Sequence, residues 1–174
     1  MIMLSYLNNN TPISAYKEEA KIKLSDDNAQ QYPYLYLTGH GNIKFSENEI
    51  IALRSMLLNG SFLHVDDNYG LDKSFRREIK KVFPKKNLVE LPKDHEIFNS
   101  YFNFPDGLPK VHEHDNKPPQ AFALFDKKRM ILLYTFESDL GDGWEDPNVH
   151  QNPLMIRENA LKMGVNIIYF ALSQ

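Results

Sequence analysis

Short apolar runs separated by polar turns predict the strands of a sheet. The central run, Phe62–Val65, is apolar apart from His64, and such a run is typical of a strand buried on both faces. Charged residues separate Ala121–Phe125 from Met130–Thr135, which favours a β-hairpin. Three further strands are expected, at Tyr34–Leu37, at Leu88–Leu91 and, as an edge strand with a loop, within Ile13–Leu24.

Apolar residues at helical spacing predict two helices between these strands. One starts at Ser46, which has the capping-box spacing with Glu49, and it ends at Asn59-Gly60. The other is capped by Asp72 or Ser74 and stops before Pro84. Three further helical segments are expected: the end of a helix at Met1–Leu7, a turn at His95–Tyr101 with Ile97, Phe98 and Tyr101 inward, and a final helix with Pro153 at its first position.

This order of elements predicts one doubly wound α/β domain. The chain has 174 residues, of which 42% are hydrophobic, so it can bury a sizeable core. A net charge of −3 without a basic run excludes a general attraction to nucleic acid. The absence of cysteine excludes disulfides, thiolate metal ligands and a cysteine nucleophile. We expect no membrane span and no signal peptide, because apolar runs are short and Met1–Leu7 lacks a basic start.

Polar side chains follow the predicted strands at their carboxyl ends. Asp66–Tyr69 follows the central strand, Gly39–Gly41 follows the strand before it, and Glu137 follows the second strand of the hairpin. Ligands of open α/β sheets bind outside the carboxyl ends of the strands, so we expect these residues to converge. The sequence therefore predicts a polar crevice at this edge.

Asp66 and Asp67 have two interpretations. As a pair they can bind a cation or act in acid–base chemistry, because neighbouring carboxylates raise each other's proton affinity. Alternatively, one caps the following helix and the other forms a salt bridge with Arg76 or Arg77. In either case we expect one of these arginines to pair with a carboxylate near the central turn.

The long segment Phe102–Gln120 contains four prolines and is expected to be irregular but ordered. In an extended stretch His112 and His114 face the same way. Two imidazoles and a carboxylate of the His112–Asp115 stretch can hold zinc or another divalent ion, but no third ligand stands at a recognisable spacing. We therefore favour a hydrogen-bonded rim, and expect the loop to fold over the strand ends as a fixed wall.

The segment Gly141–Pro147 contains the single tryptophan, Trp144, among acidic residues. An indole beside carboxylates suits the binding of a sugar ring, by stacking and by hydrogen bonds to hydroxyl groups. The favoured alternative is that Trp144 anchors an ordinary loop.

The ligand-binding candidates are the strand-end residues, the neighbouring arginines, the loop residues and this indole. They are Gly39, His40, Gly41, Asp66, Asp67, Asn68, Tyr69, Arg76, Arg77, His112, Glu113, His114, Glu137, Asp139 and Trp144. No set of metal ligands is assigned, and the sequence requires no cofactor.

Four long stretches carry a resemblance to a known family. They are YPYLYLTGHGNIKFS, FLHVDDNYGLDKSFRREIKKVFP, GLPKVHEHDNKPPQAFALF and ESDLGDGWEDP. From about Tyr32 to its C-terminus the chain resembles an uncharacterised bacterial family, one of the domains of unknown function, within the class I glutamine-amidotransferase-like superfamily. The resemblance implies a three-layer sandwich of the glutamine-amidotransferase-like or flavodoxin-like kind, with a mostly parallel sheet, a hairpin and a C-terminal helix. Members begin with a strand and a glycine-rich stretch, so we expect a single domain over residues 1–174 that lacks the family's first strand.

The superfamily comparison also predicts what the chain does not do. A glutamine amidotransferase carries a nucleophilic cysteine on the turn after a central strand and a histidine after a later one. Here Asp66-Asp67-Asn68 occupies the turn, and Glu137 and Asp139 follow Met130–Thr135 without a histidine. Because attack on the amide requires a cysteine–histidine pair, we expect no glutaminase activity.

Three functions remain open at this point. The leading hypothesis is a non-catalytic ligand-binding or interaction domain for a polar small molecule, a carbohydrate or a protein partner. The second is a hydrolase that uses the acids and histidines of the crevice, with or without a metal. The third is a structural domain of an envelope assembly. Larger relatives carry membrane segments or secretion signals, so the resemblance implies a periplasmic or envelope location, with the cytoplasm as the alternative.

Overall fold

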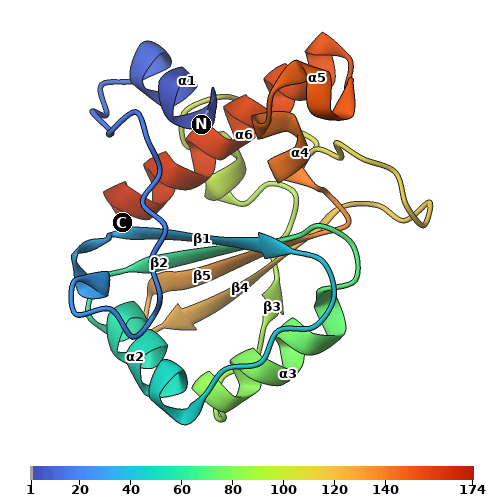
Figure 1. Ribbon diagram of the computed structural model, residues 1–174. Coiled ribbons are helices and arrows are strands. Elements are labelled where there is room, and N and C mark those ends of the chain that lie inside the picture. Colours follow the sequence, from blue (N-terminus) through green and yellow to red (C-terminus); the bar gives the residue numbers. More distant parts are fainter. Residues whose placement is uncertain (1) are drawn as a thin grey trace.

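A five-stranded sheet organises the protein, with helices on both of its faces (Figure 1). The structure is a computed structural model that describes residues 2–174, and Met1 of the predicted N-terminal helix lies outside the described residues. The strands are β1 (Tyr34–Gly39), β2 (Phe62–Asp67), β3 (Val89–Glu90), β4 (Gln120–Asp126) and β5 (Arg129–Phe136). The helices are α1 (Ile2–Asn10), η1 (Ala29–Gln31), α2 (Glu47–Leu58), α3 (Asp72–Val82), η2 (Glu96–Asn99), α4 (Leu140–Trp144), α5 (Pro147–His150) and α6 (Leu154–Ser173), of which η1 and η2 are short 3₁₀ helices.

The strand order is β1-β2-β5-β4-β3. β1, β2 and β5 are parallel, and β4 is antiparallel to both β5 and β3, so β4 alone runs in the opposite direction. The predicted mixed α/β fold with a mostly parallel sheet is therefore confirmed. The sequence did not predict this strand order, in which the hairpin β4–β5 lies between β2 and the two-residue strand β3.

Each face of the sheet has its own hydrophobic core. α2 and α3 cover one face, where Leu57 and Phe75 are buried, and α6 covers the other face together with α1 and α4 (Figure 1). β2 contributes to both cores, because successive side chains of a strand point to opposite faces. Phe62 packs on the α6 side and Val65 on the α3 side. Each fully buried large apolar side chain contributes roughly 1.5–3 kcal/mol to stability.

Two local predictions that depend on contacts within a single turn are confirmed. Oγ of Ser46 accepts the backbone N–H of Glu49, whose carboxylate accepts the N–H of Ser46 at 2.8 Å, and α2 begins at this capping box. The hairpin β4–β5 forms as expected, with Lys127 in the left-handed region at its turn (φ 55°).

The predicted edge strand within Ile13–Leu24 is wrong. This segment contains no strand, and its alternating residues Ile22 and Leu24 are half-buried against the α2–α3 core. An alternating pattern indicates which side chains can be buried, but a strand also needs a neighbouring strand with which its backbone forms hydrogen bonds.

Three helix details also differ from prediction. α3 begins after Leu71 without a side-chain cap from Asp72 or Ser74, and the carboxylate of Asp67 accepts the N–H of Leu71 at 2.8 Å. α6 begins at Leu154, so Pro153 is the residue before the helix and not its first residue as predicted. Tyr101 is 40% exposed because its hydroxyl reaches the carbonyl of Asn10 on α1, whereas Ile97 and Phe98 point inward as expected.

The helix α6 holds α4 at a fixed place through close contacts at glycines. A Cβ added to Gly143 would lie 2.3 Å from Cβ of Ala160, and one added to Gly164 would lie 2.9 Å from the ring of Trp144. Both close approaches are possible only because glycine has no side chain. No helix within residues 2–174 combines the length and apolarity that crossing a bilayer requires.

Candidate functional site

The carboxyl ends of β1, β2 and β5 lie side by side. Gly39 of β1 is paired with Asp67 of β2, and Asp66 is paired with Thr135 of β5. The turn that follows β1 and the turn that follows β2 therefore lie at the same edge of the sheet, as predicted. The segment Glu137–Asp139 begins at this edge as well, because it directly follows β5.

The two central acids do not form a pair. Asp66 and Asp67 are the last residues of β2, so their side chains point to opposite faces of the sheet. Asp67 bonds Leu71 and the hydroxyl of Tyr134 on the α3 side, whereas Asp66 bonds residues on the α4 side. The predicted acid–base pair is therefore wrong. The alternative is borne out only in that Asp67 bonds the residue before α3, because Arg76 and Arg77 pair with Asp72 and Glu78 and not with either central acid.

Asp66 is fully buried, with hydrogen-bond donors around both carboxylate oxygens. Oδ1 accepts from the hydroxyl of Thr135 at 2.5 Å, and Oδ2 accepts from the N–H of Gly141 at 2.8 Å and from the hydroxyl of Tyr36 at 3.2 Å. Burial raises the pKa of Asp66 to about 6, and the hydrogen bonds oppose this shift only in part. The neighbouring His64 stays neutral, since burial lowers its pKa to about 3.

The loop between η2 and β4 is ordered and is fixed to the strand ends, as predicted. The N–H of Val111 donates to the carbonyl of Ser138 at 2.8 Å, and the hydroxyl of Ser138 donates back to the carbonyl of Pro109. Lys110 pairs with Glu137 at 3.5 Å. These contacts place the residues after Val111 beside the end of β5.

The turn after β2 supports the same loop from its other side. The ring of Tyr69 stacks on that of His114 with centroids 4.4 Å apart, and its hydroxyl donates to Asp115 at 3.3 Å. Tyr69 adopts a left-handed backbone conformation (φ 61°), which is uncommon for an aromatic residue. The loop is therefore held by the segment after β5 on one side and by the turn after β2 on the other, and it forms a wall beside the strand ends.

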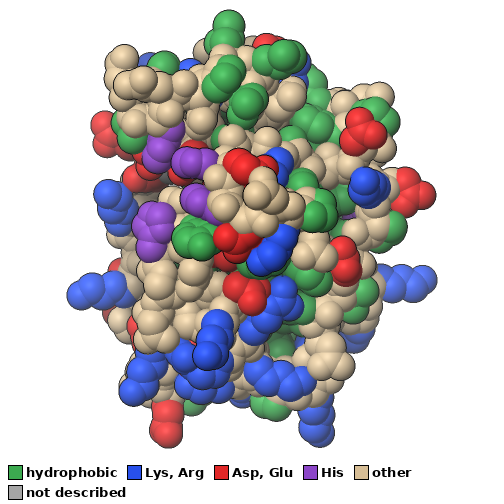
Figure 2. All heavy atoms as spheres, turned by 90° about the vertical axis from the view of Figure 1, so that its right-hand side faces the viewer, with side chains coloured by type: hydrophobic (Ala, Val, Ile, Leu, Met, Phe, Trp, Pro, Cys, Tyr) green, Lys and Arg blue, Asp and Glu red, His purple; other side chains and the backbone are tan. Residues whose placement is uncertain are grey.

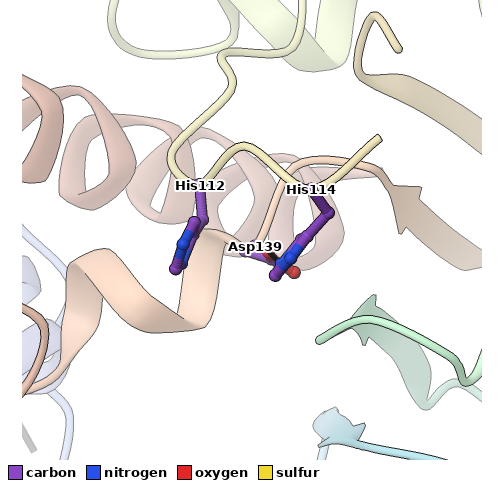
Figure 3. A group of neighbouring side chains, drawn as sticks. All are labelled: His112, His114 and Asp139. Carbon is purple, nitrogen blue, oxygen red and sulfur yellow. Dashed lines mark hydrogen bonds and ion pairs between the residues drawn. The ribbon is translucent and has the colours of Figure 1, made fainter. Parts of the chain in front are cut away.

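Two histidines and an aspartate meet at this wall (Figure 3). His112 and His114 come from the loop and point to the same side, with ring centroids 4.6 Å apart, and Asp139 approaches from the end of β5. Nε2 of His114 lies 2.5 Å from Oδ2 of Asp139. Each residue offers one potential ligand atom, and these atoms lie within 4.8 Å of one another. The space-filling view shows histidine and acidic side chains gathered on this face (Figure 2).

Asp139 is the most unusual member of the cluster. It is 1% exposed and left-handed (φ 55°), and its Oδ1 is buried without a hydrogen-bond partner. Burial raises the pKa of its carboxyl, and the hydrogen bond from His114 opposes that rise. A buried carboxylate oxygen without a partner costs roughly 1–3 kcal/mol or more, so the site as it stands is incomplete.

Asp142 and His150 lie beside the cluster, although the sequence placed Asp142 only in the sugar-binding interpretation of Gly141–Pro147 and gave His150 no functional role. Asp142 of α4 lies 3.0 Å from Nδ1 of His112 and 3.4 Å from Nε2 of His150. A carboxylate on one nitrogen of an imidazole orients the ring and leaves the other nitrogen free for a metal. Asp142 is 4% exposed and His150 also contacts Glu145. The helical spacing of Asp139 and Asp142 was a usable signal, but α4 has only five residues and was not predicted.

The donor set fits a first-row divalent metal ion. Imidazole and carboxylate ligands bind such ions at about 2.0–2.2 Å, which places tetrahedral ligand atoms roughly 3.4 Å apart. The present spread of 4.8 Å closes to that value with side-chain movements on the order of 1 Å. His112 has room for such a movement, because its side chain is 46% exposed.

Several predicted ligand-binding residues are used elsewhere. Trp144 is 4% exposed and donates its indole N–H to the carbonyl of Ala160, so it anchors α4 and cannot stack on a sugar. Arg76 pairs with Asp72 at 2.6 Å, which confirms the predicted ion pair near the central turn, and Arg77 pairs with Glu78. Both arginines lie on α3.

The remaining candidates lie at the edge but outside the cluster. His40 is exposed in the turn between Gly39 and Gly41, Asn68 is half-buried after β2, and Glu113 forms an ion pair with Lys110 at 3.0 Å. The edge predicted from the sequence is therefore the edge that carries the cluster, and among the predicted candidates His112, His114 and Asp139 are the ones whose potential ligand atoms come together there.

Comparison with known proteins identifies a family but no activity. A family model described as "Domain of unknown function (DUF4159)" matches residues 2–172. No curated protein matches the chain. The match extends over the loop, the end of β5 and α4, so the cluster lies within the family's domain.

Proposed function

This chain belongs to the family of the domain of unknown function DUF4159, and we propose that it binds a divalent transition-metal ion through His112, His114 and Asp139. The observation that carries this proposal is Oδ1 of Asp139, a buried carboxylate oxygen without a hydrogen-bond partner beside two imidazoles. A cation at the cluster gives this oxygen the partner that it lacks.

The chemistry of the three donors supports a metal of the zinc type. Neutral imidazole and carboxylate suit Zn²⁺, Co²⁺ and Ni²⁺, whereas Ca²⁺ and Mg²⁺ favour oxygen ligands alone. Nδ1 of His112 is engaged by Asp142, so Nε2 is the nitrogen left to face the ion. At His114 the ion displaces the hydrogen bond between Nε2 and Asp139.

The surroundings of the cluster support the proposal because they hold the ligands in place before an ion binds. The bond between Val111 and Ser138 joins the loop to the strand end, and Tyr69 covers the ring of His114. A site that is arranged in advance loses less conformational entropy when it binds its ligand.

Isothermal titration of the metal-free protein with Zn²⁺ and Co²⁺ tests this function. We expect one ion per chain, with a Co²⁺ absorption spectrum typical of a four- or five-coordinate site. His114→Gln and Asp139→Asn should each weaken binding by at least about tenfold. The control is His95→Asn, which removes an imidazole that caps η2 outside the cluster and keeps a side-chain acceptor for the cap.

Two results would contradict the proposal. One is a wild-type protein that binds neither ion under these conditions. The other is equal weakening by His95→Asn and by the cluster variants, which would show that histidines bind the ions without a defined site.

A metal-assisted hydrolase is the second candidate, because three protein ligands leave a coordination position open. Catalytic zinc sites keep such a position for water, whereas structural sites are closed by four protein ligands. The 46% exposure of the His112 side chain allows water to reach the ion. Zinc-dependent hydrolysis of p-nitrophenyl acetate or bis(p-nitrophenyl) phosphate, lost in Asp139→Asn, would support this candidate. Absence of both activities in the zinc-loaded protein would leave metal binding as the function.

We also infer a relationship to the glutamine-amidotransferase-like superfamily at the level of the fold. The parallel unit β1-α2-β2 and a polar turn directly after β2 support it. The chemistry of that superfamily is not proposed for this chain, because it contains no cysteine. Ammonia release from glutamine that depends on Asp66 or Asp67 would contradict the expected lack of glutaminase activity.

A further inference from the structure

The fully buried Asp66 is linked to the cluster through the backbone of α4. Its Oδ2 accepts the N–H of Gly141 at 2.8 Å, and Gly141 stands two residues after Asp139 and directly before Asp142. Within residues 2–174, no lysine, arginine or histidine forms an ion pair with Asp66. A buried carboxylate without a cation is costly for stability, so its presence calls for a role.

The turn that Asp66 contacts is strained. Glu137 and Asp139 are both left-handed, with φ of 57° and 55°, a backbone conformation that is unfavourable for residues other than glycine. Such a conformation persists only where surrounding contacts enforce it. On the loop side the bond between Val111 and Ser138 does so, and on the sheet side the bond between Asp66 and Gly141 does so.

We propose that Asp66 is a positioning residue of the metal site. By accepting the N–H of Gly141 it fixes the turn that presents Asp139, and it fixes the first turn of α4, which carries Asp142. Asp66 itself touches none of the three ligands and acts through the backbone. This inference rests on the proposed metal binding.

The role requires a hydrogen-bond acceptor at position 66 and not a negative charge. In Asp66→Asn the amide oxygen can accept from Gly141 while its NH₂ group donates to the hydroxyl of Thr135. That hydroxyl can then donate to the carbonyl of Val65, 3.3 Å away. Asp66→Leu is of similar size but offers no acceptor, so it should release the turn.

Gly141 provides an independent way to open the same contact. A Cβ added there would lie 2.6 Å from the hydroxyl oxygen of Tyr36 and 3.3 Å from Oδ2 of Asp66. Gly141→Ala should therefore push the turn away from Asp66. Tyr36→Phe removes the closer oxygen, so the double variant should let the turn return.

The test measures Co²⁺ affinity, and also the hydrogen-exchange rate of the amide at position 141 in the metal-free protein. We expect Asp66→Leu and Gly141→Ala to weaken Co²⁺ binding about tenfold or more and to speed exchange at position 141. Asp66→Asn should stay within about threefold of wild type, and Tyr36→Phe should recover most of the loss in Gly141→Ala.

Glu78→Gln is the matched control, because Glu78 is another fully buried carboxylate, paired with Arg77 and Lys81 on α3. It should lower stability and leave Co²⁺ affinity unchanged. Near-UV circular dichroism shows whether each variant is folded. If Asp66→Leu is unfolded, the Gly141 and Tyr36 variants decide the question.

The outcomes separate this inference from the proposed function. A wild-type protein that binds no metal overturns metal binding, whatever the variants do. If wild type binds and Gly141→Ala binds equally well, only the positioning role is overturned. Equal losses in Asp66→Asn and Asp66→Leu would also overturn it, because charge would then matter and not the acceptor. A loss in Glu78→Gln as large as in Gly141→Ala would indicate general destabilisation and would overturn it as well.

Discussion

Nε2 of His114 lies 2.5 Å from Oδ2 of Asp139, although the two residues are 25 positions apart in the sequence. The contact joins a proline-rich loop to the end of β5, and two strands of the sheet lie between these segments along the chain. Asp139 is the third member of the proposed ligand set, and the spacing of His112 and His114 did not reveal it. It changes the interpretation of the loop from a polar rim to one part of a candidate metal centre.

The stability of the metal-free protein should depend on pH through Asp66. Burial raises its pKa to about 6, from 3.8 in an unfolded chain, so the folded state keeps this proton over a range in which the unfolded state has lost it. The contribution of Asp66 to the free energy of unfolding is therefore fully present below about pH 4 and is lost as the pH rises through about 6. Relative to Asp66→Asn, the wild-type unfolding free energy should fall by roughly 2 kcal/mol between pH 4.5 and 7.5.

Urea unfolding of both proteins across this range, with a chelator present, measures the difference. Comparison with Asp66→Asn is needed because His64 acts in the opposite sense, its pKa being lowered to about 3, and this contribution is the same in both proteins. Parallel pH profiles for the two proteins would contradict the assignment.

Gly143→Ala should destabilise the protein by about 1–3 kcal/mol through overpacking between α4 and α6. The added Cβ would lie 2.3 Å from Cβ of Ala160. Ala160→Gly should relieve the clash, so the double variant should be more stable than the sum of the two single changes predicts. Chemical denaturation of all three variants measures this coupling, and strict additivity would show that the clash with Ala160 is not the cause of the loss.

Asn166→Ala should destabilise the protein by about 3 kcal/mol or more, because it leaves four buried or half-buried backbone groups without partners. The side chain donates to the carbonyls of Phe98 and Phe102 and accepts from the N–H groups of Tyr101 and Phe102. Limited proteolysis should also reach the start of the loop faster. The exposed Asn87→Ala is the control and should change stability by less than about 0.5 kcal/mol. Similar effects of the two changes would argue against Asn166 as the anchor of the loop.

The fluorescence of Trp144 should be that of a buried indole. Its side chain is 4% exposed and it is the single tryptophan, so emission should be blue-shifted and acrylamide should quench it only weakly. A panel of mono- and disaccharides should leave the spectrum unchanged. A saturable spectral shift with any sugar would contradict the burial of this residue and revive a carbohydrate site.

The sequence by itself determined the elements whose causes are local. Ser46 and Glu49 satisfy each other's backbone groups within one turn, and the run Phe62–Val65, apolar apart from His64, predicts a strand that is buried on both faces. It also determined the edge of the sheet that carries the site, since the carboxyl ends of parallel strands share one edge. Helical and strand periodicity act over neighbouring residues, so a single sequence shows them.

Tertiary structure decided which of the polar residues at that edge work together. Strand alternation separates Asp66 from Asp67, and insertion of the hairpin between β2 and β3 brings β5, and with it Asp139, next to β2. The close contacts of Gly143 with Ala160 and of Gly164 with Trp144 then fix α4 against α6 and place Asp142 beside His112. These relationships depend on which surfaces fit together across long stretches of chain. The physical reason is that packing and hydrogen bonding between distant segments leave no periodic signal in the sequence.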